Sequence, residues 1–330
     1  MSDVRRIERS QVPFQRDPRE EAAAAVDLST VLAGVELPNP ILPASGCFAS
    51  GAEMQRFYDV TELGALVVKS ITLEPREGLP TPRMAETPSG MLNAIGLQNP
   101  GVDAWLEHDL PWLQGKGARI IASIAGSSVD EFRTVARRLR RHAGIVAIEV
   151  NLSCPNVEHR GLVFACSAPD SAEVISAVRR ESDVPVLAKL TSDVTDVTEI
   201  ARAVVDAGAD GLTLINTVLG MTVDPETGRP GLHNTYGGLS GPAIRPIALR
   251  NVHQVREALP EVPILGCGGI RHVTEVVQFL RAGASAVSVG TATFVDPFVG
   301  PRLIDELRHW LADRGYARVT DLIDTIEPWT

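Results

Sequence analysis

The chain has 330 residues, of which 44% are hydrophobic and only 5% aromatic, so we expect a core built from aliphatic side chains. That length suits either two small domains or one large α/β barrel, a fold that commonly takes about 250 residues. The formal net charge of -10 at pH 7 leaves no basic surface that would invite nucleic acid.

Four cysteines are present, and no two of them form a Cys-x-x-Cys pair. We expect reduced thiols that cannot by themselves hold an iron–sulfur cluster or a structural zinc, and we predict no metal site. No apolar run approaches the roughly 20 residues needed to span a bilayer. These features favour a soluble, cytoplasmic protein.

The first 27 residues mix arginine with glutamate and aspartate, and they lack the apolar stretch of a signal peptide. We expect a flexible N-terminal arm over residues 1–27. A single domain is expected over residues 28–330.

Short apolar runs recur along this domain, each after a segment of helical length or a glycine turn. The eight predicted strands cover residues 40–43, 65–68, 120–124, 146–150, 186–188, 212–215, 264–266 and 286–289. Amphipathic segments predict helices over 129–142, 170–180, 197–207, 243–259, 273–282 and 297–313. Apolar strands that alternate with helices favour an α/β protein with a buried parallel sheet. Eight such units fit a (β/α)8 TIM barrel better than an open doubly wound sheet.

Long loops are predicted as insertions after strands 2, 4 and 6, over residues 71–111, 156–169 and 218–242. Insertions of this length in a barrel are usually functional or disordered, and the apolar content of the first argues against disorder. The second follows the fourth strand and is predicted to be a mobile lid over the site.

Polar or glycine residues stand at the ends of the predicted strands, where barrel enzymes build their active sites. They are Ser45-Gly46, Lys69-Ser70, Asn151, Lys189, Asn216-Thr217, Gly268-Gly269 and Gly290-Thr291. Two lysines and two asparagines among them predict a polar floor suited to an anion.

The segment Asn151-Leu-Ser-Cys-Pro-Asn156 follows the fourth strand. Asn151 and Asn156 supply amides, and the thiol of Cys154 can act as a base or a nucleophile. A lone cysteine is more often a small buried hydrophobe. Its serine, proline and asparagine neighbours, beyond the end of a strand, favour the functional interpretation.

Glycine turns follow the seventh and eighth strands, where barrel enzymes commonly bind phosphate through backbone N–H groups. Ordinary turn glycines are the alternative for Gly268-Gly269 or Gly290-Thr291 alone, and the double occurrence favours phosphate. No Gly-x-Gly-x-x-Gly fingerprint or P-loop occurs, so a mononucleotide such as FMN fits better than a dinucleotide. Lys189 would then stabilise negative charge on a reduced flavin ring.

Together these motifs resemble those of the class 1 dihydroorotate dehydrogenases. They occur in the family's order over residues 28–298, as Lys69-Ser70, Asn93-Ala-Ile-Gly-Leu97, Asn151-Leu-Ser-Cys-Pro-Asn156, Ile215-Asn-Thr217, Gly237-Gly-Leu-Ser-Gly241, Cys267-Gly-Gly-Ile270 and Val289-Gly-Thr291. The resemblance implies a barrel enzyme that oxidises dihydroorotate to orotate in pyrimidine biosynthesis.

Residue roles follow from the same resemblance. Cys154 would remove the C5 proton while hydride passes from C6 to FMN. The implied substrate-binding residues are Lys69, Asn93, Ala94, Ile95, Gly96, Leu97, Asn151, Asn156, Asn216 and Thr217. The implied FMN contacts are Ser45, Lys69, Ser70, Ser123, Asn151, Lys189, Ile215, Gly241, Gly268, Gly269, Gly290 and Thr291. Ser123 departs from the class 1B pattern, which has Asn there.

Two further segments, at residues 91–101 and 294–298, resemble class 1B, the NAD-dependent type. This implies a partner subunit that carries FAD and a [2Fe–2S] cluster, a homodimer as the core of a heterotetramer, and NAD as the acceptor reached through the partner. The chain's lack of a dinucleotide fingerprint agrees with electrons leaving in this way.

Three alternatives stay open at this stage. They are a class 1A enzyme that uses fumarate, a pyrimidine-reducing flavoprotein of the dihydropyrimidine dehydrogenase type, and a flavin-free barrel that serves as an interaction scaffold. Asn156 stands where the pyrimidine-reducing type is expected to carry His, which argues against that type. Lys69, Cys154 and Lys189 argue against the scaffold.

Overall fold

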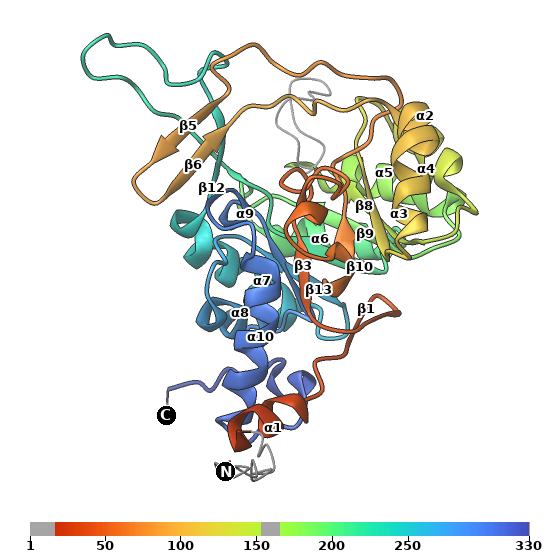
Figure 1. Ribbon diagram of the computed structural model, residues 1–330. Helices are drawn as coiled ribbons and strands as arrows, with labels where there is room; N and C mark the ends of the chain where they lie inside the picture. The colour runs from red at the N-terminus through yellow and green to blue at the C-terminus, as the bar shows by residue number, and fades with distance from the viewer. Residues whose placement is uncertain (1–16, 153–165, 330) are drawn as a thin grey trace, which may run out of the picture.

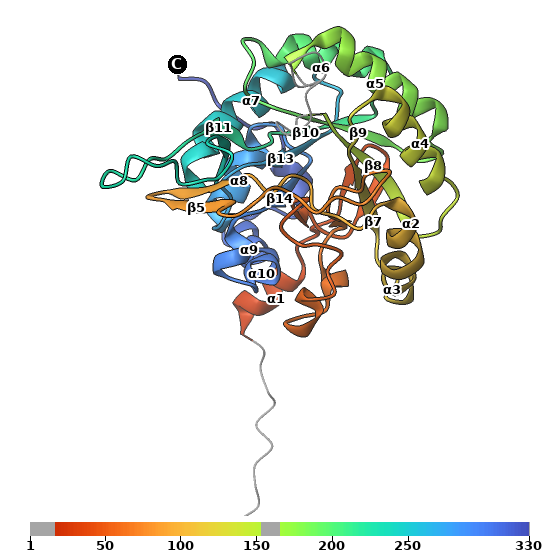
Figure 2. The same cartoon turned by 90° about the horizontal axis from the view of Figure 1, so that it is seen from above.

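The computed structural model describes residues 17–152 and 166–329. Eight parallel strands curl into a barrel in the order β3-β14-β13-β10-β9-β8-β7-β4, and helices surround it (Figures 1 and 2). Between the two end strands, the N–H of Gly64 donates to the carbonyl of Ile41 at 2.9 Å, which brings the edges of the sheet together. The predicted (β/α)8 barrel is confirmed.

The barrel strands overlap the predicted ones throughout. They are β3 (Ile41–Pro43), β4 (Leu66–Val67), β7 (Ile120–Ile124), β8 (Ile145–Asn151), β9 (Val186–Leu190), β10 (Gly211–Leu214), β13 (Ile264–Cys267) and β14 (Ala286–Val289). Most are buried on both faces, because barrel side chains pack inward against each other and outward against helices.

The longer helices also lie where amphipathic segments predicted them. They are α4 (Val129–Leu139), α5 (Ala168–Glu181), α6 (Val197–Asp206), α7 (Arg245–Ala258), α8 (Val273–Arg281) and α10 (Val299–Ala312). Shorter helices are α2 (Val102–Ala104), α3 (Leu110–Gly115) and α9 (Ala292–Val295), with a π-helical turn over Trp105–Asp109. Among the helices in the described ranges, none combines the length and the hydrophobicity that a membrane crossing requires.

Part of the expected N-terminal arm is helical. Residues Pro18–Ala24 form α1, which packs against α10 at the foot of the barrel (Figure 1). Ala23 and Val26 are buried, and the Arg19 guanidinium lies 3.6 Å from the Asp313 carboxylate. A short helix thus lies within the expected N-terminal arm, and the flexible arm over residues 1–27 stays a prediction.

The inside of the barrel changes from apolar to polar along each strand. Near the amino ends, an apolar layer packs on the hairpin of β1 (Thr30–Leu32) and β2 (Val35–Leu37). Its barrel members are Leu42, Val67, Ile121, Ala147, Leu187, Leu265 and Ala286. Side chains two positions apart share a face of a strand. The next inward layer therefore holds Lys69, Ser123, Glu149, Lys189, Cys267 and Ser288, with Thr213 beside Lys189 in the β9–β10 pairing.

Two of the segments predicted as loops are partly strands. Residues Met84–Thr87 and Gly90–Asn93 form β5 and β6, and residues Val218–Gly220 and Gly237–Ser240 form β11 and β12. They hydrogen-bond to one another as a four-stranded antiparallel sheet in the order β11-β12-β6-β5. This sheet projects beyond the barrel beside the carboxyl ends of its strands (Figure 1). We call it the roof sheet.

Candidate active site

A cavity of about 960 Å³ lies at the carboxyl ends of the barrel strands, beside the roof sheet. It is within the size range of cofactor and ligand sites. Seventeen of the predicted site residues line it: Ser45, Lys69, Ser70, Asn93, Ile95, Gly96, Leu97, Asn151, Lys189, Ile215, Asn216, Thr217, Gly241, Gly268, Gly269, Gly290 and Thr291. The fold thus brings together strand tips and loop residues that are far apart in the sequence.

Lys189 is the most deeply buried charged group of the cavity wall, with 3% of its surface exposed. Its Nζ donates to the Ser45 hydroxyl at 3.0 Å and lies 3.6 Å from Oε1 of Glu149. Burial is the largest single influence and lowers the pKa of Lys189, but Glu149, Cys267 and Cys47 together outweigh it, so that the net pKa lies above its usual value. The ammonium is therefore charged at neutral pH.

Lys69 enters the same cavity from the end of β4. A Cβ on Gly46 would lie 3.4 Å from its Nζ, so the glycine leaves room for the ammonium. Beside it, the hydroxyls of Ser70 and Ser123 are 3.0 Å apart, and Nδ2 of Asn151 donates to the Ser70 hydroxyl at 3.2 Å. The cavity floor thus holds a second cation and a hydrogen-bonded chain of polar side chains.

The glycine turns after β13 and β14 form a cradle of unpaired backbone donors. In the described part of the chain, no oxygen accepts from the N–H groups of Gly268, Gly269, Gly290 or Thr291. Gly268 and Gly269 have φ values of 140° and 76°, which favour glycine. Such clustered N–H groups bind phosphate oxygens well. The hydroxyl of Thr291 donates to Ser240 of β12 at 2.8 Å, which ties the cradle to the roof sheet.

Another part of the cavity wall is formed by the chain that continues from β6. Nδ2 of Asn93 donates to the Gly238 carbonyl of β12 at 3.2 Å, so the roof sheet holds this side chain. Gly96 and Leu97 both have positive φ values, which turn the chain into the cavity wall. Asn216 and Thr217 reach the cavity from the segment after β10. This part of the wall therefore offers amides and a hydroxyl.

Comparison with known proteins identifies the family. The family model described as dihydroorotate dehydrogenase matches residues 27–311, which is most of the chain. The chain belongs to the dihydroorotate dehydrogenase family. The sequence-based identification is thereby confirmed.

Three similar relatives all bear the name dihydroorotate dehydrogenase B (NAD(+)), catalytic subunit. The protein from Anoxybacillus flavithermus is 51% identical over 294 residues, covering 89% of this chain and 94% of the relative. That from Geobacillus kaustophilus is 52% identical over 296 residues, covering 90% and 94%. That from Bacillus pumilus is 51% identical over 296 residues, covering 90% and 95%. Within the dihydroorotate dehydrogenase family, the similarity is therefore to the B type.

Two predicted site residues do not reach the cavity wall of this dihydroorotate dehydrogenase family member. Ser123 is fully buried behind Ser70, one layer below the cavity. Ala94 packs with Leu92 and Leu232 on the other face of its strand, because neighbouring residues alternate in direction. Cys154 and Asn156 lie outside the described residues.

Two further thiols border the cavity. Burial, followed by repulsion from Cys267, raises the pKa of Cys47 to about 11. Burial likewise raises the pKa of Cys267, and the nearby Lys189 lowers it by less. Both groups are therefore protonated thiols at neutral pH and poor bases.

Sequence reasoning missed Glu149 and Thr213, which support Lys189 from inside the barrel. Glu149 is 1% exposed, and its Oε2 accepts from the Thr213 hydroxyl at 3.1 Å. Each is a polar residue within an otherwise apolar strand run, and Glu149 precedes Asn151 by two positions on the same face. That interruption of an apolar run is the signal that could have revealed them.

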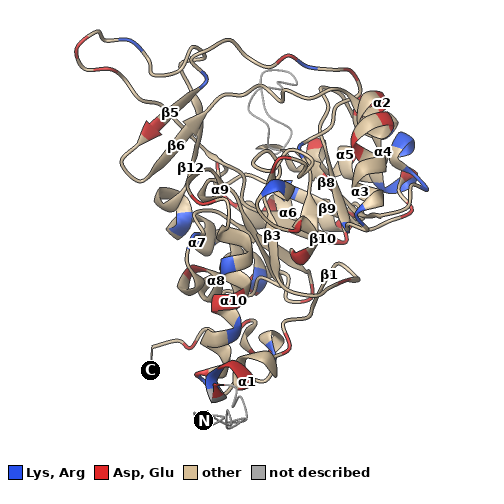
Figure 3. Cartoon of the chain, viewed as in Figure 1, with Lys and Arg blue, Asp and Glu red and all other residues tan. Residues whose placement is uncertain are grey.

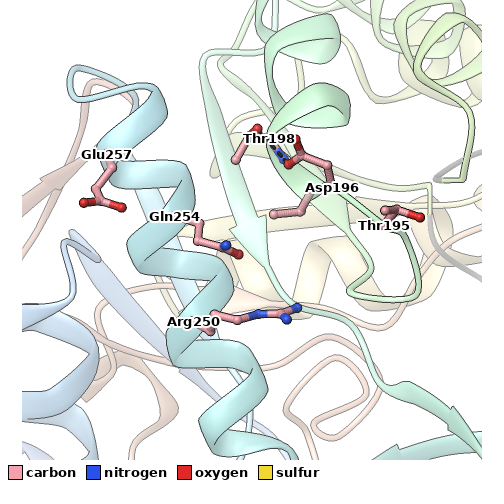
Figure 4. A pocket seen from close by; sticks show the side chains of 7 residues that line it. Thr195, Asp196, Thr198, Arg250, Gln254 and Glu257 are labelled. Atoms are coloured by element: carbon pink, nitrogen blue, oxygen red, sulfur yellow. Dashed lines mark hydrogen bonds between the residues drawn. The ribbon is translucent and has the colours of Figure 1, made fainter.

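A smaller hollow lies outside the barrel, between the start of α6 and the α7 helix (Figure 4). Its walls carry Thr195, Asp196, Thr198, Arg250, Gln254 and Glu257. Asp196 accepts from both the N–H and the hydroxyl of Thr198 at 2.8 Å, so its carboxylate caps α6. None of the predicted site residues that the structure describes lines this hollow, whereas seventeen of them line the cavity at the strand ends.

Charged residues on the outer helices carry both signs side by side (Figure 3). Arg133 pairs with Asp130 within α4, and Arg302 pairs with Glu306 within α10. This mixed distribution resembles an ordinary solvated surface.

Proposed function

We propose that this chain is an FMN-dependent catalytic subunit that oxidises dihydroorotate to orotate in pyrimidine biosynthesis. One observation carries the proposal: a single cavity joins a cradle of unpaired backbone donors to a part of the wall lined by Lys69 and amides. The family match and the names of the relatives support the same reaction.

The residues present fit a flavin mononucleotide. The unpaired N–H groups at Gly268, Gly269, Gly290 and Thr291 suit its phosphate, and a Cβ at Gly269 would lie 2.8 Å from the Gly241 carbonyl. The remaining proposed contacts are Ser45, Lys69, Ser70, Asn151, Lys189, Ile215 and Gly241, all on the cavity wall. FMN, when bound, supplies the acceptor for the hydride that leaves C6 of the substrate.

Substrate recognition is assigned to the amide-lined part of the cavity wall. Dihydroorotate carries a carboxylate and alternating carbonyl and N–H groups, which match a lysine together with amide side chains. Lys69 supplies the positive charge, and Asn93 and Asn216 supply both donors and acceptors. The hydroxyl of Thr217 adds a further partner on the same wall. Asn151 and Asn156 complete the proposed set.

Cys154 is assigned as the base that takes the C5 proton. The motif Asn151-Leu-Ser-Cys-Pro-Asn156 carries this assignment, since Cys154 itself lies outside the described residues. As its thiolate accepts the proton, the C5 electron pair forms the new double bond to C6, and hydride leaves C6. The protonated states of Cys47 and Cys267 leave neither as an effective competitor.

The electron acceptor is proposed to be NAD, reached through a separate subunit with FAD and a [2Fe–2S] cluster. The relatives are named as catalytic subunits of an NAD(+) enzyme, which supports a division of labour between chains. We propose a homodimer of this chain as the core of a heterotetramer.

Anaerobic reduction of the purified, flavin-loaded chain tests the proposal. Dihydroorotate is expected to bleach the absorbance of the bound flavin, and orotate is the expected product. Dihydrouracil is the matched substrate, because it lacks the carboxylate that Lys69 would recognise. Bleaching by dihydrouracil but not by dihydroorotate would identify a pyrimidine-reducing flavoprotein instead.

A further inference from the structure

Glu149 and Lys189 form an ion pair inside the barrel, where charges are costly unless they are paired. Their side chains are 1% and 4% exposed, and Glu149 Oε1 lies 3.6 Å from Lys189 Nζ. Lys189 lines the cavity, whereas Glu149 does not. Glu149 therefore makes no direct contact with a molecule in the cavity, and Lys189 is the group that faces both.

Only one of the two carboxylate oxygens of Glu149 accepts a hydrogen bond from the described residues. Its Oε2 accepts from Thr213, but within the described part of the chain its Oε1 has no hydrogen-bond partner. Burial of a carboxylate oxygen without a hydrogen-bond donor is unfavourable unless a nearby positive charge attracts it. The oxygen that lacks a donor is the one facing the ammonium. The attraction to the Lys189 ammonium therefore offsets the unfavourable burial of this oxygen.

We propose that Glu149 is a positioning residue that keeps Lys189 protonated and directed at the cavity, so that a positive charge stands beside the flavin in both redox states. The inference rests on the proposed flavin site. Ser45 fixes the ammonium from the other side. Within residues 17–152 and 166–329, the other titratable groups that act on Lys189 are Cys47 and Cys267, which are neutral thiols at neutral pH. Only Glu149 balances the lysine charge among these neighbours.

The consequence concerns proton uptake when the flavin is reduced. In the wild type, Lys189 is already charged and binds no proton as the flavin gains two electrons. In Glu149→Gln, burial without a counter-charge favours the neutral amine while the flavin is oxidised. Negative charge on the reduced flavin then draws one proton onto Lys189. Reduction by two electrons therefore takes up one proton more than in the wild type.

The test is the midpoint potential of the bound flavin, measured by anaerobic dithionite titration with reference dyes between pH 6 and 9. One additional proton per two electrons makes the plot of midpoint potential against pH steeper in Glu149→Gln by about 30 mV per pH unit. The reason is that a tenfold change in proton concentration corresponds to about 29.6 mV for a two-electron couple. Thr213→Val is the matched control, since it removes a hydrogen bond to Glu149 and keeps the charge. Its slope is expected to equal that of the wild type.

Lys189→Met separates action through the lysine from direct action. In that background, Glu149→Gln is expected to leave the slope unchanged. A wild-type slope in Glu149→Gln overturns the proposal, and so does an equal change in slope with and without Lys189. If Glu149→Gln alone does not fold, recovery of folding by a second Lys189→Met change supports the pairing, and failure to recover overturns it.

These outcomes are separate from those of the proposed function. Dithionite reduces any bound flavin, so the slopes test Glu149 whether or not dihydroorotate is the substrate. A wild-type chain that binds no flavin would instead defeat the cofactor assignment on which the inference rests.

Discussion

Gly269 illustrates how one missing side chain shapes the proposed phosphate cradle. Its φ is 76°, and a Cβ would lie 2.8 Å from the Gly241 carbonyl and 2.9 Å from Cβ of Arg245. A side chain there would be strained and would also press on the turn that carries unpaired N–H groups.

Gly269→Val is therefore expected to abolish flavin retention and yield colourless protein. The apoprotein should also unfold at lower temperature, because bound cofactor stabilises the folded state by mass action. Absorbance at flavin wavelengths and thermal unfolding measure both effects. Gly115→Ala is the control, since a Cβ there meets nothing within 4 Å. Normal flavin content in Gly269→Val would contradict the cradle.

Cys154→Ser tests the proposed base at the level of a single atom. A hydroxyl is a much weaker acid than a thiol, so it is rarely deprotonated near neutral pH. Flavin reduction by dihydroorotate is expected to slow by about 10²–10⁴-fold, the usual contribution of general-base catalysis. Stopped-flow absorbance measures this rate, and partial recovery is expected at high pH.

The controls for this change are the other cysteines and a variant without a proton acceptor. Cys166→Ser alters an exposed thiol and should cost far less in rate. Cys154→Ala should be at least as slow as Cys154→Ser, without recovery at high pH. A wild-type rate in Cys154→Ala would remove this cysteine from the reaction.

At the scale of secondary structure, α1 is attached to α10 through a titrating group. His309 of α10 lies 3.4 Å from Oε1 of Glu20 in α1, and its Nδ1 is 3.0 Å from the Asp305 carbonyl. The hydrogen bond with the Asp305 carbonyl raises the pKa of His309 most, burial lowers it by less, and Glu20 and the Asp305 carboxylate add smaller increases, so that the net pKa lies above its usual value. The contact should therefore depend on pH.

The sign follows from the raised pKa in the folded state. The stabilisation by protonated His309 is fully present below about pH 6.5, the ordinary histidine pKa, and is lost as pH rises through the higher folded value. His309→Gln should lower the melting temperature at pH 6 and have little effect at pH 9. The exposed His108→Gln is the control. An effect of His309→Gln that is equal at both pH values would contradict this linkage.

The barrel could be predicted from the sequence because each strand is a largely apolar run, which can be recognised from a few consecutive residues. The roof sheet could not, since its pairing joins residues such as Asn93 and Gly238, which are 145 positions apart. Glycine-rich β12 also lacks the alternation of apolar and polar residues that reveals a strand. The strand-tip residues were predictable for the same reason as the strands. Glu149 was missed because its polar side chain was included in an apolar run.

At the scale of the whole molecule, the proposed division of the reaction between two subunits predicts that the isolated chain passes electrons to NAD only slowly. Dihydroorotate should reduce the flavin of the isolated chain, whereas NAD should reoxidise it slowly, because the sequence carries no dinucleotide fingerprint. Adding the proposed FAD/[2Fe–2S] subunit should restore NADH formation. This is measured by the absorbance of NADH at about 340 nm.

The control is fumarate supplied to the isolated chain. Slow reoxidation by fumarate agrees with the B type, whereas rapid turnover would favour class 1A. Rapid NADH formation by the chain alone would contradict the need for a partner.

The roof sheet also limits how such an enzyme can be re-engineered. Its inner strands β6 and β12 come from different segments between barrel strands, yet each supplies the hydrogen-bonding edge of the other. If only one of these segments were replaced by that of a distant barrel, the remaining strand would face a new strand whose pairing register does not match its own. Both segments must be exchanged together to keep Asn93 anchored on Gly238. For libraries aimed at new substrates, the two segments are thus one module, despite the barrel units that separate them in the sequence.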